Sequence, residues 1–276
     1  MQVIKITILS ENTTYKRGVL AEHGLSYLIE NKDEKYIFDT GQNGIVLNNA
    51  KALGISLTNL NAIILSHGHY DHTGGLIDLI SEGLPVFGHP DIFIKRYSLH
   101  SDNTIHDIAI PFSRELIESK GANIKLSREQ IEIGKEIKIF TTGEVPRIND
   151  FEKVSDKFFK DKELREIDPI DDDQSLYIET KKGLVVLLGC CHSGIINTLN
   201  YIKKLTGNKK IHWIIGGTHL ISANKSRLEK TIESLRGFDF DFISPLHCTG
   251  PVAKNMLMNE FKNRFVNLSC GDSIPV

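Results

Sequence analysis

Short apolar runs alternate with helical patterns along most of this chain. The segment 3–9 alternates apolar and polar residues, which is typical of a half-buried strand, and 45–53 carries apolar residues at helical spacing before Gly54. A polar turn at 31–35 separates two further strands. For the first third we therefore predict strands at 3–9, 25–30, 36–39 and 62–65 and helices at 45–53 and 73–80.

The last third repeats this alternation, whereas the middle of the chain is less regular. We predict strands at 137–140, 176–178, 184–188, 211–215 and 240–243 and helices at 195–205, 228–235 and 252–261. In both halves, strands precede strand-helix units, an order that suits two packed sheets with helices outside. We interpret residues 1–276 as a single domain.

One segment interrupts this order. Residues 145–173 are polar and charged, with Phe158 and Phe159 as their only strong apolar pair. They lack the Gly/Ser or Pro runs that a linker would carry. We therefore expect an inserted loop or cap at about 145–173.

Composition narrows the class of protein. With 276 residues, 40% hydrophobic and 25% charged, the chain has the ordinary make-up of a globular protein with a substantial core. The net charge of −2 gives no global basic field, so no nucleic-acid partner is predicted. No apolar run approaches a membrane span, and the amino-terminal segment lacks signal-peptide features. We expect no membrane association and a cytoplasmic location; the oligomeric state stays open.

Three histidines and an aspartate follow the apolar strand at 62–65. His67 and His69 are two residues apart, so in extended chain both imidazoles project to one side and can reach the same cation. Asp71 and His72 lie where the chain turns toward the next helix and can reach a second cation. Imidazole nitrogen and carboxylate oxygen suit zinc, manganese or iron. A solvated polar loop is the alternative, and the clustering of four such residues disfavours it.

Three later histidines also follow apolar strands, namely His192, His219 and His247. Strand ends at one edge of a sheet are where a fold gathers distant residues into one site. Singly, each is more typical of a surface or hydrogen-bonded histidine, but together with the cluster His192 and His247 are expected to be ligands. For His219 three roles stay open: ligand, substrate contact or support of a ligand.

The four cysteines do not form a structural zinc motif. No pair has the C-x2-C spacing, and adjacent Cys190 and Cys191 are poorly placed to bridge each other. We expect reduced thiols at Cys190, Cys191, Cys248 and Cys270. Because Cys191 and Cys248 flank histidines, these two are the ones expected near a metal.

The segment 66–75, Ser-His-Gly-His-Tyr-Asp-His-Thr-Gly-Gly, resembles the signature of the metallo-β-lactamase superfamily. Asp39 with the following Thr-Gly resembles its first motif, an aspartate that supports the histidine loop. The motifs at 22–26, 142–147, 189–194, 216–220 and 246–250 resemble a subgroup. That subgroup includes the archaeal 7,8-dihydropterin-6-methyl-4-(β-D-ribofuranosyl)aminobenzene-5'-phosphate synthase of the methanopterin pathway.

This resemblance implies an α/β fold, specifically an αββα sandwich of two mixed sheets flanked by helices. It also implies metals at one sheet edge, with His67 and His69 on one ion and Asp71, His72 and His247 on the other. The chain departs from the general pattern, because no histidine stands at 171–174, where the usual third histidine would fall. The usual bridging aspartate would fall near 190–192. His192 therefore either occupies the bridging region or replaces the missing histidine. We predict one or two bound ions, with zinc expected and iron or manganese as alternatives.

The generic chemistry of such a site is metal-assisted attack on a small phosphate-containing or ester substrate. A bound cation lowers the pKa of its water, supplies hydroxide and stabilises developing charge. Asp71 is expected to bind metal or orient the nucleophile, and an uncoordinated His219 to donate a proton or contact the substrate. We predict a metal-dependent hydrolase whose partner is a small, phosphorylated molecule.

Two alternatives are kept. A transferase similar to the synthase would use the metal to help diphosphate leave, with Arg147 and Glu144 among the substrate-binding residues. Spacing alone makes Arg147 a solvated loop arginine. The third hypothesis is a metal-containing protein that senses a ligand without turnover.

Overall fold

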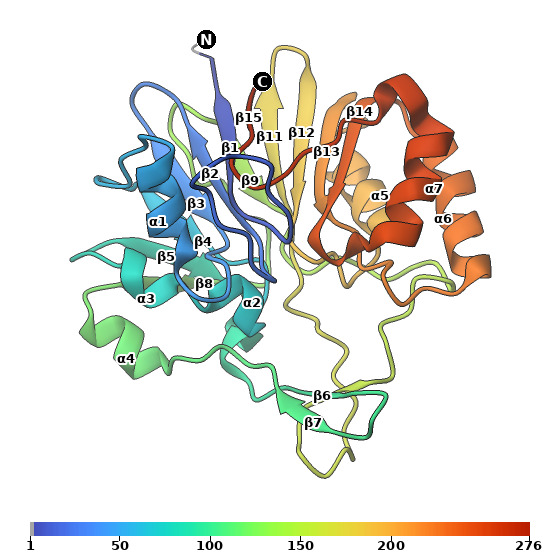
Figure 1. The fold of residues 1–276 in the computed structure, drawn as a ribbon, viewed down its shortest axis with the longest axis horizontal. Helices are drawn as coiled ribbons and strands as arrows, with labels where there is room; N and C mark the ends of the chain where they lie inside the picture. Colours follow the sequence, from blue (N-terminus) through green and yellow to red (C-terminus); the bar gives the residue numbers. More distant parts are fainter. Residues whose placement is uncertain (1–2) are drawn as a thin grey trace.

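Two mixed β-sheets lie side by side in the computed structural model, which describes residues 3–276 (Figure 1). Within these residues the first sheet has seven strands, in the order β15 (Ser273–Pro275), β1 (Lys5–Ser10), β2 (Ser26–Glu30), β3 (Lys35–Phe38), β4 (Ala62–Ile64), β5 (Pro85–Gly88) and β8 (Asn123–Leu126). The second has five, in the order β14 (Phe240–Leu246), β13 (Ile211–Gly217), β12 (Gly183–Leu188), β11 (Leu176–Thr180) and β9 (Ile139–Thr141).

The main core lies between the two sheets. Apolar side chains that alternate along the strands point inward from both sides and are buried, among them Ile6, Ile8, Tyr27, Phe38, Ile178, Val185, Leu187 and Ile215. Burial of this kind contributes roughly 1.5–3 kcal/mol for each large apolar side chain. The alternating pattern of the sequence therefore accounts for the face that each strand turns to its partner sheet.

Helices cover the two outer faces (Figure 1). The first sheet is covered by α1 (Ile45–Ala52), α3 (Leu76–Leu79) and α4 (Arg114–Ser119). The second is covered by α5 (Ile195–Leu205), α6 (Lys225–Arg236) and α7 (Pro251–Phe261). The predicted αββα architecture is confirmed. None of the helices in residues 3–276 has both the length and the apolar character that crossing a bilayer demands.

The strand directions bring several carboxyl ends to one edge of the sandwich. In the first sheet β3, β4 and β5 are parallel, and in the second β12, β13 and β14 are parallel. The residues that follow β4, β12, β13 and β14 are those of the predicted histidine motifs. Parallel topology thus explains how segments far apart in the sequence contribute to one site.

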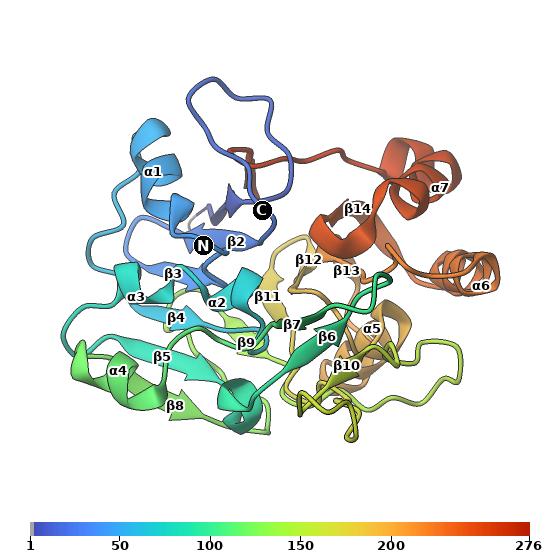
Figure 2. The same ribbon diagram turned by 60° about the horizontal axis from the view of Figure 1, so that its bottom comes forward.

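A third, smaller sheet stands apart from the sandwich and forms a cap. Its strands β10 (Phe158–Phe159), β6 (Tyr97–Leu99) and β7 (Ile105–Asp107) lie across the edge where the two large sheets meet (Figure 2). The predicted insertion at 145–173 supplies only β10 of this sheet. The β6–β7 hairpin was not predicted, because β7 is exposed and carries no apolar pattern.

The helix predicted at 73–80 is shorter than expected, because only Leu76–Leu79 of that range is helical beyond Thr73. The chain instead forms two single turns, α2 (Tyr70–Thr73) and α3, separated by Gly74 and Gly75. A Cβ on Gly74 would lie 1.9 Å from the Gln42 carbonyl oxygen, and one on Gly75 would lie 2.2 Å from that of Thr40. The two glycines therefore serve a close approach of backbone to backbone, and the helix is interrupted where this approach occurs.

Candidate metal centre

Asp39, at the end of β3, holds the start of the histidine loop. Its Oδ1 accepts a hydrogen bond from the Ser66 backbone N–H (2.7 Å), and its Oδ2 accepts one from the Ser66 hydroxyl (2.7 Å). The Ser66 hydroxyl also lies 2.8 Å from Nδ1 of His67, and Asp39 Oδ2 lies 2.6 Å from Nδ1 of His72. One buried carboxylate thus orients two imidazoles, which leaves the Nε2 atom of each ring to face the site.

Gly68 lets the loop pass close to a neighbouring segment. A Cβ at this position would lie 2.1 Å from the carbonyl oxygen of Ile92. The Gly68 N–H donates to Asp172 Oδ2 at 2.8 Å. The peptide between His67 and His69 is therefore held from two sides.

The structure brings His67, His69 and His192 into one buried cluster. Each offers a ring nitrogen within 4.8 Å of the others, and His67 Nε2 lies 2.9 Å from His69 Nδ1. Among the described residues, no hydrogen-bond partner reaches His69 Nε2 or either ring nitrogen of the buried His192. Asp173 accepts a hydrogen bond from the Ser193 N–H at 2.9 Å and supports the turn that carries His192. The structure thus groups His192 with His67 and His69, as a replacement of the missing third histidine would require.

The three imidazoles of this cluster are suited to binding a cation because their rings are uncharged. Burial lowers the pKa of each well below its ordinary value, and neighbouring positive groups lower the pKa further. At neutral pH the rings of His67, His69 and His192 are therefore uncharged and keep a lone pair for a metal.

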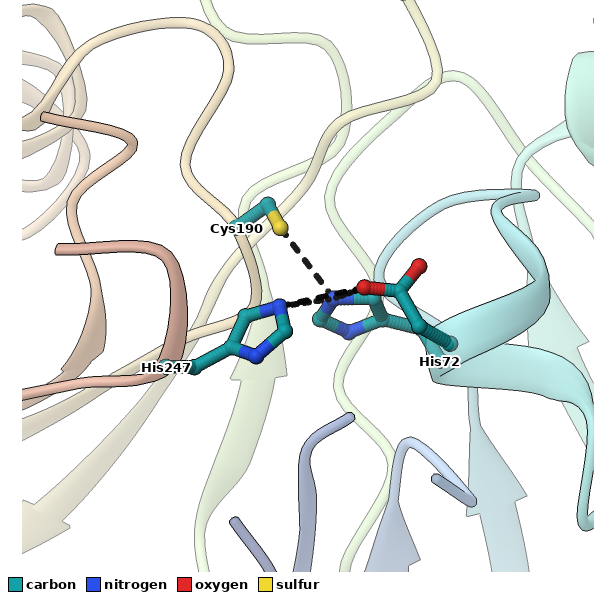
Figure 3. Close-up of side chains that lie close together, drawn as sticks. His72, Cys190 and His247 are labelled. Atoms are coloured by element: carbon teal, nitrogen blue, oxygen red, sulfur yellow. Dashed lines mark hydrogen bonds and ion pairs between the residues drawn. The ribbon is translucent and has the colours of Figure 1, made fainter. Parts of the chain in front are cut away.

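A second cluster lies beside the first and contains Asp71, His72, Cys190 and His247 (Figure 3). His72 Nε2 is 3.2 Å from Cys190 Sγ and 3.2 Å from His247 Nε2, which in turn lies 3.2 Å from Asp71 Oδ2. His247 Nδ1 lies 2.8 Å from the Asn12 side-chain oxygen, which leaves Nε2 to face the cluster. Each residue thus presents one donor atom to a common point.

Charge pairing dominates the second cluster. Burial opposes the charge on His72, but Asp71 and Asp39 together raise the pKa of His72 to about 9. Burial likewise opposes the charge on Asp71, yet His72, His23 and His247 hold the pKa of that carboxyl well below its usual range.

The cysteine that joins this cluster is Cys190, which sequence reasoning missed. Cys191 was expected near a metal, but its Sγ faces Thr198 Oγ1 in α5 at 3.4 Å and packs among the apolar residues there. Cys248, the other thiol expected near a metal, lies beside the second cluster, where its Sγ donates to the Cys190 carbonyl at 3.3 Å. Cys191 has a positive φ of 60°, and this reversal of the backbone directs two adjacent thiols to different places.

His219 lies beside both clusters. Its ring centre is 4.1 Å from that of His192, and together with Cys190 and His192 it forms a third group of converging donors. His219 Nδ1 is buried without a hydrogen-bond partner in the described chain. His219 and His247 have positive φ values of 47° and 49°, a strained conformation for residues with a side chain. Two of the residues that present imidazoles to the site are therefore held in a strained backbone conformation.

Both clusters open on one cavity of about 430 Å³. Its wall includes Phe158 of the cap, whose ring lies 5.6, 5.5 and 5.9 Å from those of His69, His192 and His219. His23 also lines the cavity, with Nε2 at 3.3 Å from Asp71 Oδ2. Sequence reasoning assigned His23 no role, although it stands in one of the motifs of the resemblance.

The structure does not bring Arg147 and Glu144 to this cavity. Glu144 pairs with His89 (2.9 Å) and with Arg128, and Arg147 donates to the Ile170 carbonyl at 2.8 Å. Both line a separate hollow of about 270 Å³. Their placement therefore gives no support to the prediction that they bind a substrate at the histidines.

Comparison with known proteins places this fold and site in a family. The sequence pattern of the metallo-β-lactamase superfamily matches residues 20–94. The 7,8-dihydropterin-6-methyl-4-(β-D-ribofuranosyl)-aminobenzene-5'-phosphate synthase of Methanocaldococcus jannaschii is 36% identical over 98% of this chain and 96% of its own length. This chain belongs to the metallo-β-lactamase superfamily. Within the superfamily it belongs to the subgroup that resembles this synthase, as the sequence motifs predicted.

Two further relatives are consistent with this membership of the superfamily. An uncharacterised protein of the same organism is 36% identical over 89% of this chain and 90% of its own. The crystal structure of Tm1679, a metal-dependent hydrolase of the β-lactamase superfamily, has 29% identity and a TM-score of 0.85, with 99% of both chains covered. With a synthase and a metal-dependent hydrolase as relatives, this member of the superfamily is an enzyme.

The residues present fit the metals that the superfamily implies. Neighbouring donors of a tetrahedral zinc site lie about 3.3–3.8 Å apart, given bonds of about 2.0–2.3 Å. In the second cluster, four of the distances between donor atoms are 3.2 to 3.7 Å, close to that spacing. The unpartnered nitrogens of His69 and His192 are the further sign, because buried polar atoms without partners are rare and costly.

Proposed function

We propose that this enzyme binds two divalent cations and hydrolyses a small phosphorylated substrate. The observation that carries the proposal is the convergence of two donor clusters on a single cavity of about 430 Å³. Two such cations would activate water and neutralise charge on a phosphoryl oxygen. One would be held by His67, His69 and His192, and the other by Asp71, His72, Cys190 and His247.

Zinc is the metal that these donors favour. Three imidazoles form the first cluster, and the second adds a thiol to imidazoles and a carboxylate. A thiolate is a soft ligand that favours zinc over manganese or magnesium. Zinc in both clusters is therefore the proposed state.

Other residues around the cavity would donate a proton, exclude water and bind the substrate. His219 lies beside the clusters without being needed to complete either, so we assign it proton donation to the leaving group. Phe158 covers the first cluster and limits the access of bulk water. The hydroxyls of Ser98, Ser155 and Ser222, with Lys157, line the outer cavity and suit the oxygens of a phosphate.

A transferase that displaces diphosphate is the second candidate. It is favoured by one observation, the 36% identity over nearly the whole chain to an enzyme named as a synthase. A non-catalytic sensor is not retained, because the relatives named for an activity are enzymes.

Metal analysis and isotope labelling test the proposal together. The purified protein is expected to contain two zinc ions per chain by plasma mass spectrometry. A panel of phosphate monoesters, diesters and diphosphates turned over in ¹⁸O-labelled water should give ¹⁸O-labelled phosphate. His69→Ala should abolish this turnover, whereas His212→Ala, which removes a histidine paired with Asp241 outside the cavity, should not.

The two candidates predict different products. A protein without metal would contradict both. A metal-loaded protein that releases diphosphate only when an aromatic amine is supplied, and forms a new carbon–nitrogen bond, would replace the hydrolase with the transferase.

A further inference from the structure

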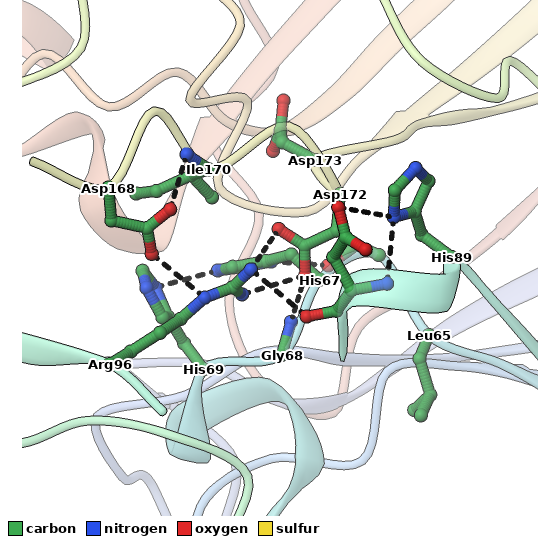
Figure 4. A network of polar contacts seen from close by, with 12 residues as sticks. Leu65, His67, Gly68, His69, His89, Arg96, Asp168, Ile170, Asp172 and Asp173 are labelled. Carbon is green, nitrogen blue, oxygen red and sulfur yellow. Dashed lines mark hydrogen bonds and ion pairs between the residues drawn. The ribbon is translucent and has the colours of Figure 1, made fainter. Parts of the chain in front are cut away.

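A buried arginine, Arg96, lies beside the segment that carries His67, Gly68 and His69 (Figure 4). Arg96 is only 1% exposed. Its Nη1 and Nη2 donate to the two oxygens of Asp172, each at 2.7 Å, and its Nε lies 2.9 Å from Asp168 Oδ2. A guanidinium held by two buried carboxylates is costly to desolvate, so a protein gains little stability from it compared with apolar packing. We therefore expect Arg96, Asp168 and Asp172 to serve a purpose other than stability, namely to hold neighbouring segments in place.

One arm of the network formed by Arg96, Asp168 and Asp172 reaches the loop that carries His67 and His69, here called the metal loop. Asp172 Oδ2, which accepts from Arg96, also accepts the Gly68 N–H at 2.8 Å. Gly68 is the residue between His67 and His69, so the bidentate contact orients the carboxylate that holds this peptide. Lysine cannot reproduce that fork, because its ammonium is a single point of charge.

The other arm reaches the cap. The Asp168 N–H donates to the Phe158 carbonyl at 2.8 Å, and Phe158 is the cap residue that covers His69 and His192. Arg96 itself directly precedes β6, and its carbonyl accepts the Ile108 N–H at 2.9 Å just after β7. Arg96 is therefore tied through its backbone to both ends of the β6–β7 hairpin, and through its side chain to Asp168, whose backbone N–H contacts β10.

We propose that Arg96 is a positioning residue that sets the wall of the substrate cavity relative to the His67–His69 pair. Asp172 transmits its position to the metal loop, and Asp168 transmits it to the cap. This role rests on the proposed metal centre, since its consequence is the geometry of the first cluster. If the ion pairs of Arg96 only stabilised the fold, their loss would instead weaken metal binding and cap packing equally.

Cobalt titration and hydrogen exchange of the full-length protein separate the two arms. Cobalt at the second cluster gives a sulfur-to-metal charge-transfer band through Cys190, whereas the three-histidine cluster contributes ligand-field bands without sulfur. Asp172→Asn should weaken cobalt binding at the three-histidine cluster about 10- to 100-fold and leave the sulfur band unchanged. Asp168→Asn should leave both cobalt affinities unchanged and speed amide exchange in β6 and β10.

Arg96→Lys should show both effects, and Arg236→Lys provides the matched control. Arg236 makes an equally bidentate contact with Glu260 at 2.7 and 2.8 Å, but on the exposed surface of α6. If Arg96→Lys does not fold, the two aspartate variants still decide the matter. Native cobalt binding in Asp172→Asn, or native exchange of the cap in Asp168→Asn, would overturn the proposal. Failure of the wild-type protein to bind cobalt would instead contradict the metal centre itself.

Discussion

Cys190 and Cys191 are adjacent thiols with opposite surroundings. Cys190 Sγ lies 3.2 Å from His72 Nε2 in the second cluster, whereas Cys191 packs against α5. Cys190→Ser should therefore remove about one metal ion per chain and lower activity at least about tenfold, since even groups that only support metal ligands matter to this extent. Cys191→Ser is the matched control and should retain both ions. Equal metal content in the two variants, measured by plasma mass spectrometry, would rule out Cys190 as a ligand.

Gly68 is a residue for which no side chain has room. A Cβ would lie 2.1 Å from the Ile92 carbonyl oxygen, a backbone atom that cannot rotate away. We expect Gly68→Ala to lower the free energy of unfolding by about 3 kcal/mol or more, or to displace His67 and His69 and reduce metal binding. At Gly237 a Cβ would meet only the Ser234 carbonyl at 3.3 Å, so Gly237→Ala should have little effect. Urea denaturation with metal analysis of both variants measures the difference.

At the scale of elements, Glu152 joins the 145–173 segment to the start of α5. Its two carboxylate oxygens accept the backbone N–H groups of Ile196 and Asn197, each at 2.9 Å. These donors have no partner inside the helix, and a negative charge at this end is favourable. Glu152→Ala should cost about 2 kcal/mol of stability by urea denaturation. Glu233→Ala, an exposed change on α6, should cost little, and equal losses would contradict the anchoring role.

Glu34 connects the two large sheets and gives stability a dependence on pH. It precedes β3 in the first sheet and accepts the N–H groups of Lys135, Glu136 and Ile137, at 3.2, 3.1 and 2.9 Å, which lead into β9 of the second. Burial raises the pKa of Glu34, but these three hydrogen bonds lower it more, and the net shift is downward. The folded state therefore prefers the ionised carboxylate.

The sign of the effect follows from that preference. Because the folded pKa lies below the unfolded one, the stabilisation is fully present above the unfolded pKa and is lost as the pH falls through the folded pKa. At pH 7, Glu34→Gln should lower the free energy of unfolding by about 1–3 kcal/mol. The difference between wild type and variant should shrink below about pH 4. A difference that does not change with pH would exclude the carboxylate charge as its source.

At the scale of the whole molecule, apolar runs predicted most of the sandwich but not its cap. The strands β12, β13 and β14 and the helix α5 lie where buried apolar patterns placed them, because their side chains fill the core. The β6–β7 hairpin packs over a polar cavity instead of a core, so its sequence carries no such signal. The pairing of β6 with β10 is also a contact between distant segments, which periodicity does not encode.

The candidate site, like the fold, was predictable from the sequence only in part. The histidines that follow apolar strands do converge, because strand order places their carboxyl ends at one edge. Two features needed the fold: that His192 completes the cluster of His67 and His69, and that Cys190 instead of Cys191 faces the second cluster. Both depend on the direction of the backbone within one turn after β12, including a positive φ at Cys191. Arg147 and Glu144 were placed with the substrate from their motif, although their side chains lie elsewhere.

Because buried donors are concentrated at the junction of the two sheets, the proposed metal centre predicts that the stability of the whole molecule depends on metal. Five buried histidines, an aspartate and a cysteine face one another there, drawn from segments after β4, β12 and β14. Each cation that binds only the folded state stabilises it by about 4 kcal/mol at a free concentration 1,000 times its Kd. For a chain of this size each kcal/mol corresponds to about 2–4 °C, so a chelator should lower Tm by about 8–16 °C for each ion that it removes. The double variant His69→Ala with Cys190→Ser should respond much less. A wild-type Tm that does not change, although metal analysis shows complete removal, would contradict a metal centre that joins the two sheets.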